Sequence, residues 1–122
     1  MVSVQTLSHP DFSQPFLVAT DMSNVGLGAM LYQQVLGTME CKWISFTARA
    51  LQPSECRYSV MKKELLAIIF MLKKFHTYLW GHKFTLFMDH RALVYLHVQK
   101  GLNPMMTAWL DTLFNYDFTI VH

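Results

Sequence analysis

FLVATDMSNVGLGAML, residues 16–31, is the stretch that decides how the rest of the chain folds. Its first apolar run, residues 16–19, leads into Asp21, and a turn-like Ser-Asn pair separates it from a second apolar run. An apolar run that ends in an acid predicts a buried strand with the acid at the rim of a sheet, which is where open α/β sheets bind ligands. The pattern returns at residues 84–88, which run straight into Asp89.

Turn residues and a change of period predict the remaining elements. Three runs joined by short turns favour an antiparallel meander, and a three-four spacing of apolar residues then favours one long helix. The glycines of the second run, Gly26 and Gly28, are expected to mark a bulge or a close approach by another backbone. The predicted strands cover residues 16–21, 26–33, 40–48, 83–88 and 118–121, and the predicted helices cover residues 58–79, 91–98 and 104–116.

The long helix is expected to bring three acids to one place. It separates the meander from the fourth strand, which suits a parallel pairing of the first and fourth strands with a right-handed crossover. Asp21 and Asp89 would then lie at the same edge of the sheet. At about 100° per residue, Glu64 lies about 100° from Leu65, on the flank of the stripe that faces the sheet. Glu64 is therefore expected to lean over the rim near the two strand ends.

Three carboxylates in one place predict a cation site. Without a partner they repel one another, and a hard divalent cation with oxygen ligands removes that repulsion. Two such ions about 3.5–4 Å apart activate a water and stabilise the leaving oxygen of a phosphodiester. From spacing alone, simpler roles stay open: Asp89 as a helix N-cap, Asp21 as a turn residue that bonds the backbone two residues on, and Glu64 as a solvated helix residue.

Composition bounds the class of protein. A chain of 122 residues that is 52% hydrophobic and 15% charged is typical of one folded domain, with no segment long enough to cross a membrane. A net charge of +2 is compatible with nucleic acid without arguing for it. Cys41 and Cys56 lack the spacing of a disulfide framework or a zinc site, which favours reduced, buried thiols in an intracellular protein.

Other side chains carry weaker expectations. Lys63 and Lys74 are placed on the helix face opposite the apolar stripe. The last helix is expected to turn Met105, Trp109, Leu110, Leu113 and Phe114 inward, and the three tryptophans are expected to be core or half-buried anchors. Arg49 and Arg57 either contact nucleic acid or are solvated. A cationic group at the end of the long helix either binds phosphates or complements the helix dipole: Lys73, Lys74, His76, His82 and Lys83.

Four stretches resemble the ribonuclease H domain of gypsy-type LTR retrotransposon reverse transcriptases. Together they cover nearly the whole chain in the family's order, so no single motif carries the resemblance. The matching stretches are PDFSQPF at residues 10–16, TDMS at 20–23 with GLGAML at 26–31, KELLAI at 63–68 with YLWG at 78–81, and DHRAL at 89–93.

The resemblance implies a ribonuclease H-like α/β fold: a mixed five-stranded sheet, three antiparallel strands and then parallel strands, with flanking helices. Residues 1–15 would form a leading segment that follows a polymerase connection, and residues 16–122 would form the domain. Asp21, Glu64 and Asp89 would be catalytic acids that bind two Mg²⁺ ions, with Mn²⁺ as a substitute.

The implied function is the ribonuclease H module of a retroelement polyprotein. It would hydrolyse the RNA strand of RNA–DNA hybrids during reverse transcription, beside the polymerase domain of the same polyprotein. The alternative is a non-catalytic remnant or scaffold that contacts nucleic acid or the polymerase.

The chain departs from the family's pattern at several positions. The family's fourth acid lies in a motif after the last strand, and this sequence stops at His122 before reaching it. Lys62 stands where the family often has Glu, Met22 stands for the usual Ala, and Met88 stands for the usual Thr. We therefore expect a domain without its final C-terminal motif and with weak or no nuclease activity as an isolated chain.

Overall fold

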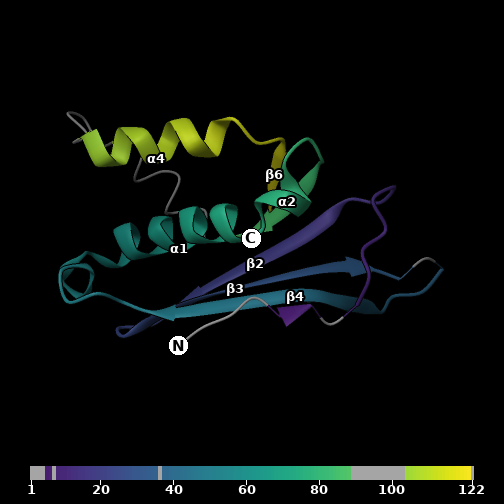
Figure 1. Cartoon of the computed structure of the whole chain (residues 1–122), viewed down its shortest axis with the longest axis horizontal. Helices are drawn as coiled ribbons and strands as arrows, with labels where there is room; N and C mark the ends of the chain where they lie inside the picture. Colours follow the sequence, from purple (N-terminus) through teal and green to yellow (C-terminus); the bar gives the residue numbers. More distant parts are fainter. Residues whose placement is uncertain (1–4, 7, 36, 89–103, 122) are drawn as a thin grey trace.

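A computed structural model describes residues 5–6, 8–35, 37–88 and 104–121 of the chain. Its centre is one mixed sheet with the strand order β1-β4-β3-β2-β5-β6, and the helices cover one face of that sheet (Figure 1). The strands are β1 (Gln5–Thr6), β2 (Phe16–Met22), β3 (Gly26–Gln34), β4 (Cys41–Ala50), β5 (Phe84–Phe87) and β6 (Phe118–Val121). The helices are η1 (Glu55–Arg57), α1 (Val60–Lys74), α2 (His76–Leu79) and α4 (Pro104–Phe114).

The predicted five-stranded mixed sheet is confirmed. β2, β3 and β4 form an antiparallel meander, whereas β2 pairs with β5, and β5 with β6, in parallel. The two-residue β1 is an addition that pairs with β4. The helix predicted over 91–98 lies outside the described residues. Among the described helices, none has the length and apolar character that crossing a membrane requires.

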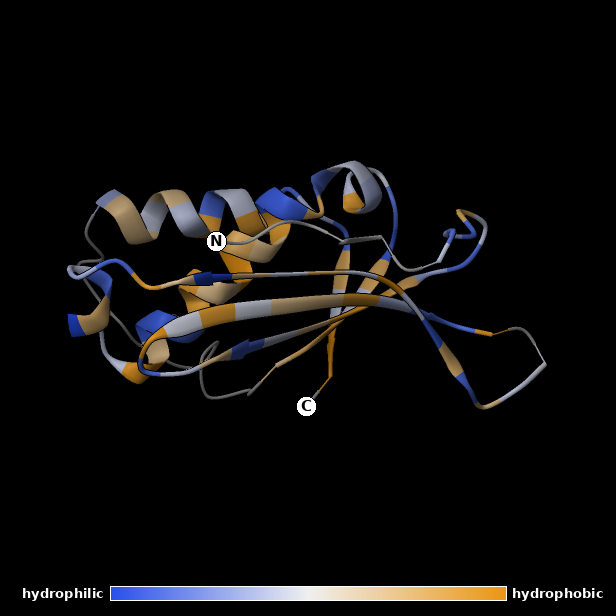
Figure 2. Cartoon of the chain, turned by 60° about the horizontal axis from the view of Figure 1, so that its bottom comes forward, coloured by the Kyte–Doolittle hydropathy of each residue, from blue (hydrophilic) through white to orange (hydrophobic). Residues whose placement is uncertain are grey.

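The core forms where α1 packs on β2 and β3. Apolar residues are banded along the strands (Figure 2) because alternate side chains point to opposite faces. Phe16, Val18 and Leu31 are fully buried against Ile68 and other apolar residues of α1. Each buried side chain of this size contributes about 1.5–3 kcal/mol relative to an exposed one, so this contact is what holds α1 over the sheet.

Local signals place the ends of α1. Ser59 is its N-cap, and the Ser59 hydroxyl accepts a hydrogen bond from the Lys62 N–H at 3.2 Å. The predicted single helix is interrupted at Phe75, which separates α1 from the short α2. After α2 the chain turns at Gly81, whose φ of 78° lies in the left-handed region that glycine adopts readily.

A buried glutamine holds the leading segment on the sheet. Gln33 is fully buried on the face of β3 that carries the core residues. Its Oε1 accepts from the Asp11 N–H at 2.8 Å, and its Nε2 donates to the carbonyls of Asp11 at 2.7 Å and Gln14 at 3.2 Å. Because three backbone groups are satisfied by one amide, residues 11–14 are held against the sheet.

The expectation for the two glycines is half right. A side chain at Gly26 would meet the Arg49 carbonyl oxygen at 3.2 Å, so another backbone does approach closely there. At Gly28 the nearest atom would be 3.9 Å away, which is an ordinary contact. The irregularity in pairing lies instead between Leu31 and Tyr32, opposite Ile44.

Several burial predictions are wrong. Lys63 is only 6% exposed because a second cluster, around Leu66 and Phe70, buries that side of α1 as well. Lys63 lies within about 20° of Phe70 around the helix axis. Phe114, expected to point inward, is 60% exposed at the last position of α4, and in α4 the buried residues are Met106 and Leu113.

The cysteines are also placed differently from the prediction. Cys41 and Cys56 are free thiols, as expected, but both are exposed instead of buried. Cys41 is the first residue of β4, and Cys56 lies in the surface turn η1, so neither position reaches the core. Trp43 and Trp80 are about half exposed and Trp109 is partly buried, in agreement with the predicted anchors.

Replacing Thr47 by valine is expected to stabilise the protein. The Thr47 hydroxyl is buried and has no hydrogen-bond partner among the described residues. An unsatisfied buried hydroxyl costs about 1–3 kcal/mol, so Thr47→Val should raise the free energy of unfolding by ~1 kcal/mol in urea denaturation. Thr119→Val, at an exposed position of β6, is the control and should change it little. A less stable Thr47→Val protein would show that the hydroxyl is satisfied in solution.

Candidate active site

Asp21 lies where β2 reaches the edge of the sheet. It is the sixth of the seven residues of β2 and pairs with Gly28 of β3. The side chain is exposed, and its Oδ1 accepts a hydrogen bond from the Met22 N–H at 2.9 Å. The simpler turn role of Asp21 would require a hydrogen bond to the residue two positions on. The observed bond is to the next residue, Met22. One carboxylate oxygen is thus held by the backbone, and the carboxylate stays at the sheet edge.

Glu64 comes to the same place from the helix. It lies in the second turn of α1, and its side chain is half-buried with the Oε2 atom inaccessible to solvent. Its neighbour Leu65 is buried in the core, which fixes the rotation of α1 about its axis. Glu64 consequently lies on the flank of α1 that meets the sheet.

One pocket joins the two acids. It has a volume of about 120 Å³ and lies between the end of β2, the middle of α1 and the residue that follows β5. The residues that line it are Thr20, Asp21, Met22, Glu64, Ala67, Ile68 and Met88. The structure therefore brings two of the three predicted site residues together. Asp89, the third, lies outside the described residues, although Met88 immediately before it lines the pocket.

The donor atoms of the pocket suit a hard divalent cation. Carboxylate oxygens are the ligands that Mg²⁺ and Mn²⁺ prefer, and both Asp21 and Glu64 supply them. The pocket holds several times the roughly 30 Å³ share of one water molecule, so it has room for an ion with part of its hydration shell. Within the described ranges no three His, Cys, Asp or Glu side chains lie close enough together to hold a metal ion. The described part of the pocket therefore supplies two acids, Asp21 and Glu64.

An ion pair fixes the connection that leads into α1. The Arg49 guanidinium binds Glu55 at both ends, with Nη1–Oε1 and Nη2–Oε2 distances of 2.7 and 2.9 Å. Glu55 Oε1 also accepts from the Gln52 N–H at 2.8 Å, and the guanidinium lies 5.5 Å from the centre of the Phe70 ring. Both ends of the Arg49 guanidinium are therefore engaged by Glu55, while 29% of the Arg49 side chain is exposed. Arg49 ties the end of β4 to η1 and α1, the helix that carries Glu64.

This ion pair changes the pKa of both partners. Hydrogen bonds from Arg49 lower the pKa of Glu55 below its ordinary value of 4.5, with support from the Gln52 N–H and the Arg49 charge; burial opposes this shift. The hydrogen bonds with Glu55 raise the pKa of Arg49. Both shifts favour the charged pair, which is consistent with its bidentate geometry.

Two members of the cationic group, Lys74 and His76, have contacts at the far end of α1. His76 Nδ1 lies 2.7 Å from the Tyr116 hydroxyl, and the His76 and Trp80 rings are in contact. Lys74 Nζ lies 5.9 Å from the centre of the Phe70 ring. Lys74 is ten residues beyond Glu64, about 15 Å along the helix axis. His76 thereby connects α2 to Tyr116, which follows α4, away from the pocket.

Sequence reasoning does not identify the roles of four residues in or near the site. The sequence marks Met22 and Met88 only as unusual residues, and their place in the pocket wall depends on how β2, β5 and α1 meet. The bidentate pair of Arg49 and Glu55 gave no signal in spacing, because it joins a strand end to a turn.

The family comparison identifies relatives of the chain. Residues 11–116 match the model of the RNase H-like domain found in reverse transcriptase. The chain is 40% identical over 114 residues to the Retrovirus-related Pol polyprotein from transposon 297 of Drosophila melanogaster, covering 93% of this chain and 10% of the relative. It is 34% identical over 104 residues to the corresponding polyprotein from transposon gypsy, covering 84% and 10%. The chain thus spans about a tenth of the length of these curated relatives.

Solved structures share the fold. The foamy viral protease-reverse transcriptase in complex with dsDNA has a TM-score of 0.73 at 19% identity, covering 94% of this chain and 24% of that chain. The same enzyme in complex with an RNA/DNA hybrid has a TM-score of 0.71 at 19% identity, covering 93% and 16%. At this level of identity the likeness shows the fold alone.

Acid should weaken the ion pair of Arg49 and Glu55. Because the folded-state pKa of Glu55 is lowered, its contribution to stability is present above pH 4.5 and is lost as the pH falls through the folded-state value. Glu55→Gln should lower the free energy of unfolding at neutral pH by about 1–3 kcal/mol, and the difference from the wild type should shrink over the pH range below 4.5. Urea denaturation across this range measures both effects. Glu40→Gln, an exposed control, should change neither, and a Glu55→Gln deficit independent of pH would contradict the assignment.

Proposed function

Because the chain belongs to the family of RNase H-like domains found in reverse transcriptases, we propose that it is the ribonuclease H module of a retroelement polyprotein. In this role it hydrolyses the RNA strand of an RNA–DNA hybrid during reverse transcription. The ions required are two Mg²⁺, with Mn²⁺ as a substitute. The single observation that carries the proposal is the meeting of Asp21 and Glu64 in one pocket at the strand ends.

Asp89 is proposed as the third acid of this site. β2 and β5 are parallel, and Ala19 pairs with Phe87. Two residues further along each sequence are Asp21 and Asp89. Met88, which lies between Phe87 and Asp89 in the sequence, lines the pocket that holds Asp21 and Glu64. This supports a shared site formed by Asp21, Glu64 and Asp89.

The residues of the pocket have separate tasks in the proposed reaction. When bound, the metal ions supply the activation of a water and the stabilisation of the leaving oxygen. Asp21 and Glu64 bind and orient the ions, and their mutual repulsion is removed by the positive charge they hold. The backbone hydrogen bond from the Met22 N–H to Asp21 limits the rotation of that carboxylate. The ion pair of Arg49 and Glu55 ties η1, the turn that precedes α1 and Glu64, to the end of β4.

The proposed partners follow from the relatives. Solved foamy viral relatives are complexes with dsDNA and with an RNA/DNA hybrid. We propose a hybrid as the substrate of this chain, recognised through shape, phosphates and 2′-hydroxyls. We further propose that residues 1–15 lead from a polymerase domain of the same polyprotein into the domain of residues 16–122. The hydrogen bonds of buried Gln33 to residues 11–14 would then hold that junction on the sheet.

Removing either pocket acid should greatly weaken divalent ion binding. In Asp21→Asn and Glu64→Gln the affinity for Mg²⁺, measured by calorimetry, should fall by about 100-fold or more, because an ionised ligand is lost. Any Mg²⁺-dependent cleavage of a labelled RNA–DNA hybrid should fall in parallel. Asp111→Asn, at an exposed position of α4, is the matched control and should behave as the wild type.

Two results would count against the proposed function. Cleavage that persists at wild-type rate in both variants would place the chemistry elsewhere. Hybrid binding by a wild-type chain that binds no divalent ion would favour the alternative, a non-catalytic scaffold that contacts nucleic acid.

A further inference from the structure

The far end of α1 carries basic side chains that the pocket does not use. Residues 65–88 contain no Asp or Glu. Within them, Lys73 and Lys74 lie in the last turn of α1, and Lys83 directly precedes β5. All three lysines are exposed, and no salt bridge joins any of them to another described residue. This end of the helix is therefore a surface of excess positive charge.

The helix dipole accounts for only part of this surface. Cations in the last turn of a helix complement the negative end of its dipole, which suits Lys73 and Lys74. Lys83 lies beyond α2, directly before β5, so this explanation does not extend to it. Asp117 lies beside the start of β5, where its carbonyl accepts a hydrogen bond from the first residue of that strand at 3.2 Å. Its carboxylate offsets at most one of the three lysines, so positive charge remains for an anionic partner.

An exposed indole lies between Lys74 and Lys83 along the chain. Trp80 is the residue that caps the end of α2, and its side chain is 51% exposed. The centre of its ring lies 5.4 Å from that of His76 and 5.3 Å from that of Tyr116. His76 is held in turn, because its Nδ1 lies 2.7 Å from the Tyr116 hydroxyl. These contacts restrict the orientation of the indole while about half of it stays open to solvent.

Unpaired ammonium groups beside a restrained, open indole suit a single-stranded nucleic acid. Phosphates of the strand attract the lysines, and a base without a pairing partner offers its face to an aromatic ring. In a duplex the bases are stacked on one another, so a duplex would leave the indole unused. We propose that Lys73, Lys74 and Lys83 contact the phosphates of a single strand of DNA or RNA while Trp80 stacks on one of its bases.

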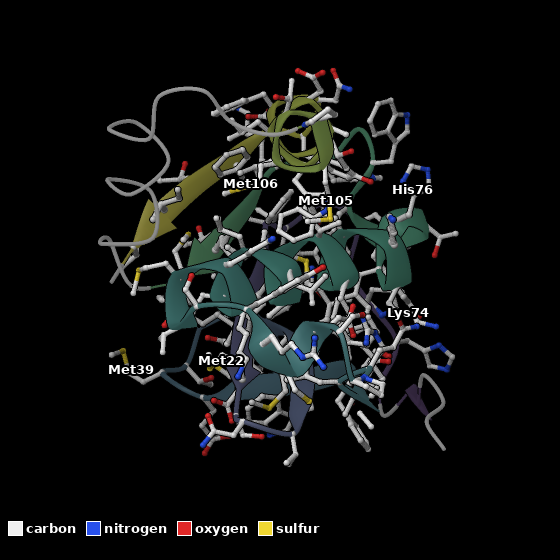
Figure 3. The ribbon with its side chains drawn as sticks, turned by 90° about the vertical axis from the view of Figure 1, so that its left-hand side faces the viewer. Met22, Met39, Lys74, His76, Met105 and Met106 are labelled. Carbon is white, nitrogen blue, oxygen red and sulfur yellow. The ribbon has the colours of Figure 1, made fainter. Side chains whose placement is uncertain are left out.

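This single-strand surface is separate from the pocket. Lys74 lies about 15 Å beyond Glu64 along the helix axis. Figure 3 shows Lys74 and His76 on one flank of the view and Met22, which lines the pocket, on the other. Strand binding here needs neither a metal ion nor a carboxylate of the pocket. The inference therefore goes beyond the proposed function and is tested independently of it.

Fluorescence anisotropy with labelled oligo(dT) and oligo(U) of about 12 nucleotides, in buffer with EDTA, measures strand binding by the whole chain. Each phosphate contact with a single strand contributes about 0.7 to the slope of log Kobs against log salt concentration. The double variant Lys73→Gln with Lys74→Gln should therefore bind more weakly and make this slope shallower by about 1.4. Arg57→Gln with Lys62→Gln removes the same charge near the other end of α1 and should leave the slope unchanged.

The indole should act without changing the salt dependence. Trp80→Ala should weaken binding by about fivefold or more, and the slope should stay as in the wild type because stacking releases no counterions. Trp80→Phe keeps an aromatic face and should recover much of the affinity. Trp43→Ala, at an indole that is 47% exposed in β4, is the matched control and should bind as the wild type. Circular dichroism of each variant checks that its fold is intact.

The outcomes separate this inference from the proposed function. Unchanged strand binding in Asp21→Asn supports a surface outside the pocket. Equal losses of slope in the two charge variants would show a diffuse effect of net charge and overturn the assignment. Full affinity in Trp80→Ala, or a blunt RNA–DNA hybrid bound as tightly as the single strands, would overturn the stacking. Absence of single-strand binding by the wild type would overturn the whole inference and leave the ion site of the pocket standing.

Discussion

The parallel pairing of β2 with β5 beneath α1 is the constraint on which the rest of the structure depends. Two parallel neighbours need a crossover, and α1, about 22 Å long at 1.5 Å per residue, supplies it. The apolar stripe of α1 is buried on Phe16 and Val18 of β2, so the rotation of the helix is set by the core. Asp21 at the strand end and Glu64 on the helix flank then come to one pocket without any separate site-building element.

Features that depend on local periodicity could be predicted from the sequence. The meander, the parallel fourth strand and α4 beginning at Pro104 follow from alternation, three-four spacing and turn residues. The proximity of Asp21 and Glu64 could be predicted for the same reason, because these periods determine both the end of the strand and the side of the helix that faces the sheet. Alternation also places Gln33 at a core-facing position of β3, where a polar residue requires a buried hydrogen-bond partner.

Features that depend on tertiary contacts could not be predicted from the sequence. Lys63 is buried because a second cluster forms beside the first, which a single apolar stripe does not reveal. The pairing of Arg49 with Glu55 depends on how η1 folds back on β4. The same holds for Met22 and Met88: their identity was visible in the sequence, but their place in the wall of an acidic pocket required the assembled strands and helix.

The central claim is that Asp21 and Glu64 form one divalent ion site, and paramagnetic NMR tests it most directly. Trace Mn²⁺ added to the ¹⁵N-labelled chain broadens amide signals near the bound ion. We expect broadening in both segments that line the pocket, residues 20–22 and 64–68, and its loss in Asp21→Asn. Broadening confined to one segment, spread over the surface, or unchanged in Asp21→Asn would contradict a shared site.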